Sequence, residues 1–195
     1  MKKCLIVYYS QGGTTDKVAK KIATGLHAAE YQTDLYNIKE KSPPETVGYD
    51  LLGIGSPTYY FRPPFNVTDY LNSLPKLYGL PTFVFTLHGT YQGDCGNIIR
   101  HALVQKEAQD VGYFHCHGAD YFYGYLKEGY LFSPDSPTAG ELAQAEDFGR
   151  RLLIALRVKD ILEHQTTLIL ELYIAWSDFL QIAGCVTRSI VVSLA

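Results

Sequence analysis

Short apolar segments alternate with segments of helical periodicity along most of this chain, and that alternation restricts the possible folds more than any other feature. The apolar segments that predict strands cover residues 3–9, 31–37, 49–55, 80–87 and 113–119. Apolar stripes at helical spacing predict helices over residues 14–29 and 65–74, around 98–103, and over 142–156. Helices that alternate with strands of this kind are typical of an α/β fold, in which helices cover both faces of a parallel sheet.

Composition excludes several classes of protein. The chain has 195 residues, of which 47% are hydrophobic and 19% are charged, so it can bury a core without cross-links. Its formal net charge of −3 argues against a nucleic-acid partner, which would require a concentrated basic surface. The 16 tyrosines suggest a planar ligand, a partner surface or a core with hydroxyls at its edge.

The four cysteines, Cys4, Cys95, Cys116 and Cys185, are far apart and form no C-x-x-C motif. This spacing excludes zinc ribbons, thioredoxin-like redox pairs and ferredoxin-type iron–sulfur motifs. The apolar start at residues 4–9 is too short for a signal peptide. We therefore expect a cytoplasmic protein with reduced thiols.

Three loops follow the first, third and fourth predicted strands, and all are rich in small, polar or aromatic residues. They cover residues 10–15, 56–64 and 88–96. Ligands of open parallel sheets bind beyond the carboxyl ends of the strands. We therefore expect the binding site where these three loops meet.

The first of these loops has the composition of an anion site. Glycines allow backbone N–H groups to converge, and the start of the following helix adds free donors. The loop contains no Lys or Arg, and it matches neither the phosphate loop of nucleoside triphosphatases nor the dinucleotide fingerprint. A phosphate monoester held by uncharged donors fits this chemistry. The alternative is an ordinary helix start with Thr14 or Thr15 as its N-cap.

The motif Ile6-Val7-Tyr8-x-Ser10-x-x-Gly13-x-Thr15-x-x-x-Ala19-x-x-Ile22 resembles the flavodoxin signature at every specified position, and Gly55-Ser56-Pro57-Thr58-Tyr59 is similar to the second loop of that superfamily. The resemblance covers about residues 2–156. It implies a flavodoxin-like, doubly wound, five-stranded parallel sheet in strand order 2-1-3-4-5, with non-covalently bound FMN and a role in electron transfer. The residues it assigns to the FMN phosphate are Ser10, Gln11, Gly12, Gly13, Thr14 and Thr15.

The second and third loops are then expected to hold the flavin ring. In the second loop the candidates are Pro57, Thr58, Tyr59, Tyr60 and Phe61, with Tyr59 or Tyr60 as one wall. In the third loop they are His88, Gly89, Thr90, Tyr91 and Gly93, at the pyrimidine edge and second face of the ring.

Two charges in these loops have alternative explanations. Arg62 either neutralises a reduced flavin, binds an acidic partner or is simply solvated, and Asp94 either disfavours the reduced flavin or caps a helix.

Two further clusters leave alternatives open. His115 and His117 lie on one face of the last predicted strand and could share a metal with Cys95, although scattered residues of this kind are more often structural, so we predict no metal site. The aromatic residues 121–125 either line the flavin site or a substrate shelf, or form a tucked loop.

Three functions are compatible with this site. We expect an FMN-dependent electron carrier with no catalytic side chains, whose redox partner is a separate iron–sulfur protein or flavoprotein. The alternatives are an FMN-dependent NAD(P)H or quinone oxidoreductase and an interaction module without flavin. The intact first loop argues against the last of these.

The end of the chain needs a separate explanation. We divide the chain into a flavodoxin-like domain, residues 1–160, and a helical extension, residues 161–195. Glu171 and Asp178 interrupt the apolar tract of the extension, which disfavours a membrane span. We expect an amphipathic helix that packs on the domain or forms a homo-oligomer.

Overall fold

A computed structural model of the protein describes residues 1–28, 31–154, 156–157, 165 and 171–172. Its centre is a five-stranded sheet in which every neighbouring pair of strands is parallel, in the order β2-β1-β3-β4-β5. The strands are β1 (Lys2–Tyr8), β2 (Tyr31–Asn37), β3 (Leu51–Pro57), β4 (Pro81–His88) and β5 (Gln109–His117). The predicted fold class and strand order are both confirmed, with β2 at one edge as expected.

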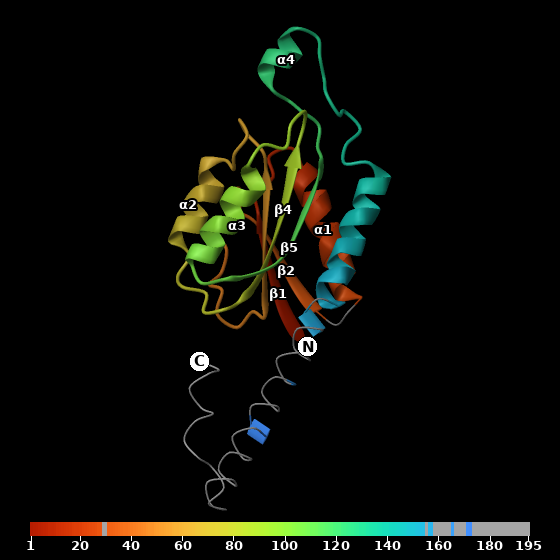
Figure 1. The fold of residues 1–195 in the computed structure, drawn as a ribbon. Coiled ribbons are helices and arrows are strands. Elements are labelled where there is room, and N and C mark those ends of the chain that lie inside the picture. Colours follow the sequence, from red (N-terminus) through yellow and green to blue (C-terminus); the bar gives the residue numbers. More distant parts are fainter. Residues whose placement is uncertain (29–30, 155, 158–164, 166–170, 173–195) are drawn as a thin grey trace, which may run out of the picture. The chain divides into compact units, whose positions relative to one another are not determined.

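Helices cover both faces of the sheet. The labelled helices are α1 (Thr14–His27), α2 (Phe65–Ser73), α3 (Cys95–Gln105) and the short α4 (Tyr123–Lys127). A further helix covers residues 139–154. In Figure 1, α2 and α3 lie on one side of the sheet, whereas α1 and the 139–154 helix lie on the other. The helices therefore form a layer on each side, as the alternation of elements predicts.

The face under α2 and α3 is closed by aliphatic side chains. Leu5, Val7, Leu52 and Ile54 alternate along β1 and β3 and are buried against a group from α3 that includes Ile99. Successive strand residues point to opposite faces, so residues two apart share this layer. Because the sheet is buried on both faces, its central strands are nearly continuous apolar runs.

The opposite face depends on glycines in β3. A Cβ atom at Gly53 would lie 2.3 Å from Cζ of Phe83, and one at Gly55 would lie 2.1 Å from Cζ of Phe85. The two rings therefore occupy the space that side chains on β3 would need. Phe148 of the 139–154 helix packs edge-on against Phe83, with ring centroids 5.9 Å apart, and closes this layer.

The 139–154 helix packs very closely against α1. A Cβ on Gly25 would come within 2.0 Å of the Glu146 carbonyl oxygen, and one on Gly149 within 2.4 Å of the Ile22 carbonyl oxygen. Glycines at these facing positions allow the two backbones to touch. The last helix of the domain therefore supports the helix that follows the first loop.

Some predicted boundaries were wrong. β5 begins at Gln109 rather than at Tyr113, because the polar pair Gln109–Asp110 pairs with Pro81 and Thr82 on β4. β3 extends to Pro57, since Ser56 and Pro57 still pair with β4. α4 was predicted as part of a long loop. In Figure 1 it lies beyond the carboxyl ends of the strands.

The chain divides into two compact units, residues 1–154 and 155–195. The predicted boundary at residue 160 lies outside the described residues, and so does most of the predicted extension, residues 161–195. Within the part of the chain that the structure describes, we find no helix with the length and apolar character that crossing a bilayer requires.

Candidate functional site

The three predicted loops do meet, around a cavity of about 650 Å³ at the carboxyl ends of the strands. Of the predicted site residues, those that line it are Gln11, Gly12, Thr14, Thr15, Pro57, Thr58, Tyr59, Tyr60, Phe61, His88, Gly89, Thr90 and Tyr91. Ser10, Gly13 and Gly93 do not line it and act in the framework behind it. A fourth wall comes from the segment after β5: Gly118, Ala119, Asp120, Tyr121, Phe122, Tyr123 and Tyr125.

Ser10 is fixed by Asn37 at the end of β2. The backbone N–H of Ser10 donates to Oδ1 of Asn37 at 3.1 Å, and Nδ2 of Asn37 donates to the Ser10 carbonyl oxygen at 3.1 Å. Both residues are buried, so this double contact fixes the start of the first loop at a position shielded from solvent. Asn37 was missed in the sequence. Its only signal there is a polar residue at the carboxyl end of an edge strand.

The hydroxyl of Ser10 is also engaged. Its Oγ accepts a hydrogen bond of 3.3 Å from the backbone N–H of Asp16, in the first turn of α1. The carboxylate of Asp16 accepts from the Tyr8 hydroxyl at 2.6 Å and pairs with Lys20 at 2.7 Å. Burial alone would raise the pKa of Asp16, but the hydrogen bonds from Lys20 and Tyr8 outweigh it and lower that pKa. The one acidic group of this helix start is thus neutralised by its own neighbours.

Gly13 is the N-cap of α1, with φ of 84°, which is the left-handed region that favours glycine. Neither Thr14 nor Thr15 is the N-cap, so the N-cap residue expected for an ordinary helix start was wrong. Both threonines belong to the first helical turn and line the cavity. The N–H groups of a first turn have no partner within the helix, and the helix dipole is positive there. This end of the cavity therefore suits an anion.

The second loop presents its aromatic residues from a strained turn. Tyr59 and Arg62 close it with two backbone hydrogen bonds of 2.9 and 3.1 Å. Tyr60 and Phe61 between them have φ of 49° and 69°. This conformation normally requires glycine or asparagine and costs about 1–3 kcal/mol for each bulky residue. The rings of Tyr60 and Phe61 are largely exposed at the mouth of the cavity, and the side chain of Arg62 is exposed outside it.

The third loop is joined to the second through Gly93. A Cβ there would lie 2.5 Å from Cα of Phe61, and the N–H of Asp94 donates to the Phe61 carbonyl oxygen at 2.9 Å. Tyr91 packs edge-on against Phe61, with centroids 5.6 Å apart. Asp94 occupies the N-cap position of α3, but its carboxylate accepts from Asn97 and makes no capping bond. The two loops therefore form one wall.

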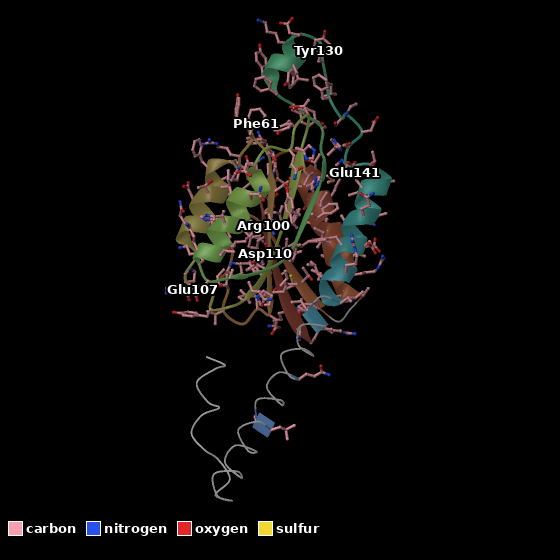
Figure 2. All side chains as sticks on the ribbon, in the orientation of Figure 1. Phe61, Arg100, Glu107, Asp110, Tyr130 and Glu141 are labelled. Atoms are coloured by element: carbon pink, nitrogen blue, oxygen red, sulfur yellow. The ribbon has the colours of Figure 1, made fainter. Side chains whose placement is uncertain are left out.

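The fourth wall comes from the aromatic segment after β5. Tyr60 and Phe122 meet edge-on across the cavity, with centroids 5.7 Å apart, and a Cβ on Gly89 would lie 2.3 Å from Cβ of Asp120. Of the two interpretations of residues 121–125, the structure supports the one in which they line the site. Figure 2 shows Phe61 at this edge and Tyr130 farther out, beside α4.

Neither a reactive thiol nor a metal centre is found near the site among the residues that the structure describes. Cys95 is buried beside Ser56, and burial raises the pKa of its thiol to about 11, so it is protonated. Among the residues that the structure describes, no three His, Cys, Asp or Glu side chains are grouped to hold a metal ion. His88 is buried and lines the cavity.

The cavity thus has two chemically distinct kinds of wall. The first loop offers backbone donors and hydroxyls around Gln11–Thr15, and no lysine or arginine is among the lining residues. The second and third loops contribute the rings of Tyr59, Tyr60 and Tyr91, and the Tyr59 hydroxyl donates to Oε1 of Gln11 at 3.2 Å. A ligand with a phosphate at one end and a flat aromatic ring at the other fits these donors and walls.

Comparisons with known proteins agree with this geometry. A family model described as "Flavodoxin domain" matches residues 5–126. An uncharacterized protein of Methanocaldococcus jannaschii is 29% identical over 154 residues, which cover 77% of this chain and 98% of that protein. The structure is similar to that of a flavodoxin from Archaea, with a TM-score of 0.61 at 16% identity over 80% of this chain and 99% of the other.

Two more solved structures share the fold. For a flavodoxin of Bacillus cereus, Flavodoxin 2, the TM-score is 0.58 and the identity 23%, over 80% of this chain and 99% of that one. For the flavodiiron core of Flv1 from Synechocystis, the TM-score is 0.61 and the identity 18%, over 81% of this chain but only 36% of the larger chain.

Proposed function

The chain belongs to the flavodoxin domain family, and from that premise we propose that it binds FMN non-covalently in the cavity and transfers electrons through it. The observation that carries the proposal is the first loop. This loop places uncharged donors, around Gln11–Thr15, in the wall of a cavity whose other walls are rich in aromatic rings. That combination matches a phosphate monoester attached to a planar ring.

In this proposal each wall has a separate task. The N–H groups at Thr14 and Thr15, with the hydroxyls beside them, bind the phosphate, and Asn37 keeps the loop in shape through Ser10. Tyr59 or Tyr60 packs against one face of the ring, and Tyr91 against the other. FMN supplies the electron chemistry when bound, and the protein supplies binding and the local field. No side chain is required as an acid or base.

The proposal includes the partners. The chain has no C-x-x-C motif for an iron–sulfur cluster, so we propose that electrons pass to or from a separate iron–sulfur protein or flavoprotein in the cytoplasm. A quinone or NAD(P)H is the alternative partner. Residues 161–195 are proposed to mediate self-association.

The first experiment is the visible spectrum of the purified full chain, followed by fluorescence titration of the FMN-free chain with FMN and with riboflavin. We expect flavin absorption and quenching of added FMN. Each hydrogen bond to a charged group contributes about 1.5–3 kcal/mol, so the loss of two of them should make riboflavin bind at least about 100-fold more weakly. A colourless protein that does not quench FMN would contradict the proposal and favour an interaction module.

The second experiment separates the two redox functions. The FMN-loaded chain is reduced with dithionite in one cuvette and with NADPH in another, and the flavin absorbance is followed. A carrier is bleached stepwise by dithionite and not by NADPH. Rapid bleaching by NADPH would instead assign the chain to the oxidoreductases.

A further inference from the structure

Three histidines gather beside the cavity at the carboxyl ends of β4 and β5. The ring of His88 packs against that of His117, with centroids 4.7 Å apart, and against that of His115 at 5.7 Å. His88 lines the cavity and is only 8% exposed, whereas the side chain of His117 is 52% exposed. The cluster therefore extends from solvent to the cavity wall. Apart from the contact with the flavin ring expected of His88, the proposed function assigns it no role.

Glu141 fixes the outer histidine. Its Oε1 accepts from the backbone N–H of His117 at 2.9 Å and lies 3.1 Å from Nδ1 of the same residue. Its Oε2 accepts from the backbone N–H of Thr138 at 2.7 Å, in a capping box at the start of the 139–154 helix. Figure 2 shows Glu141 at this end of that helix. A carboxylate on Nδ1 orients the ring and fixes which ring nitrogen faces away from it.

The histidine that lines the cavity, His88, has one ring nitrogen that is buried. Nδ1 of His88 is buried and makes no hydrogen bond with any residue that the structure describes. Burial, with His117 and His115 adding to it and Glu141 opposing, lowers the pKa of His88 to about 4, so this ring is neutral at physiological pH. A neutral imidazole accepts a proton at one nitrogen and releases one from the other, so it can pass a proton on without holding a charge.

From this arrangement we propose that His117, oriented by Glu141, and His88 form a path that carries protons between solvent and the cavity. The inference rests on the proposed function. If an external donor protein gave bound FMN its first electron, the proton that balances the added charge would leave solvent and pass through His117 and then His88 to the cavity. Both imidazoles finish in their original protonation state. His115 lies beside the path and contributes to the low proton affinity of His88.

The main test measures proton uptake directly. The FMN-loaded full chain is mixed in a stopped-flow instrument with reduced methyl viologen, which gives up one electron and no proton. A pH-indicator dye reports proton uptake while flavin absorbance reports reduction. We compare the wild type with His88→Gln, His117→Gln and Glu141→Gln. Since a positioned imidazole accelerates proton transfer by 10²–10⁴-fold, we expect uptake to slow at least tenfold in both histidine variants and less in Glu141→Gln. Added imidazole should restore the rate in His117→Ala.

His101→Gln is the matched control, because His101 is an exposed histidine on α3. It should leave the rate of proton uptake unchanged. An unchanged rate in His88→Gln, or equal slowing in His101→Gln, would overturn the proposed path. Because His88 lines the cavity, the FMN dissociation constant of His88→Gln is measured together with its rate. Normal FMN affinity in His117→Gln and Glu141→Gln, whose residues do not line the cavity, keeps a slower proton uptake separate from the proposed function.

A second readout needs no FMN. NMR titration of the FMN-free chain follows the ring of His88, whose pKa should rise in His117→Gln because one cause of its depression is removed, and should stay unchanged in His101→Gln. If His88 titrates identically in all three proteins, its ring is not coupled to His117 and the path is refuted. A chain that binds no FMN would refute the proposed function, while this titration would still decide the coupling.

Discussion

Asn37 offers the sharpest test of how the first loop is held. Its side chain exchanges two hydrogen bonds of 3.1 Å with the backbone of Ser10, and both residues are less than a tenth exposed. Asn37→Ala leaves the N–H and the carbonyl of Ser10 buried without these partners. An unsatisfied buried group costs about 1–3 kcal/mol, and water entering the space left by the side chain recovers part of that. We expect the free energy of unfolding to fall by about 2–3 kcal/mol.

Calorimetry or circular dichroism on the FMN-free chain measures that loss. For a chain of this size, each kcal/mol lowers Tm by about 2–4 °C, so Tm should fall by roughly 4–12 °C. The FMN dissociation constant should also rise, by about tenfold or more. In the variant, part of the free energy of FMN binding is used to order the first loop.

Asn97→Ala is the matched control. It removes the same side chain and a 2.8 Å hydrogen bond to Asp94, but at an exposed position on α3. Surface changes of this kind alter stability by less than about 0.5 kcal/mol. If Asn37→Ala melts within a degree of Asn97→Ala and binds FMN equally well, then Asn37 does not hold the loop and the reasoning fails.

Three other predictions concern the sheet, the turn and pH. Gly55→Ala should destabilise the chain by about 1–3 kcal/mol or prevent folding, because its Cβ would lie 2.1 Å from Phe85; urea denaturation measures this. Tyr60→Gly should raise Tm by relieving a left-handed φ while weakening FMN binding; equal FMN affinity would remove Tyr60 from the ring site. Burial would raise the pKa of Glu141, but bonds from Thr138 and His117 hold it at about 2. The ionised carboxylate therefore stabilises the fold fully above about pH 4.5, and this stabilisation is lost as the pH falls towards 2. When Tm is measured against pH, the fall in Tm over this range should be smaller in Glu141→Gln.

The sequence predicted the sheet well because its strands are buried on both faces. Such strands are continuous apolar runs, and β1, β3 and β4 stand out for that reason. The start of β5 was predicted too far along the chain, because Gln109 and Asp110 at its true start are polar and only partly buried. α4 was missed because five residues are too few to show helical periodicity.

The loops that line the site were predicted from their residue types, whereas the residues that hold those loops in place were not. Glycines, hydroxyls and aromatic rings after strands identify the loops that line the cavity. Asn37 could not be found this way, because its role depends on β2 ending beside Ser10, which is a fact of strand order rather than of local sequence. The strained turn at Tyr60 and Phe61 also had no signal, since bulky residues rarely adopt a positive φ.

The close contact between α1 and the 139–154 helix has a consequence for the order in which the protein is made. α1 is near the amino end of the chain, and the glycine-mediated contact that supports it comes from the last helix of the domain. During synthesis, more than a hundred residues must leave the ribosome before Gly149 can meet Ile22. We therefore expect the nascent chain to keep that side of α1 open until translation of the domain is nearly finished, and a chain stopped before residue 139 to need a chaperone.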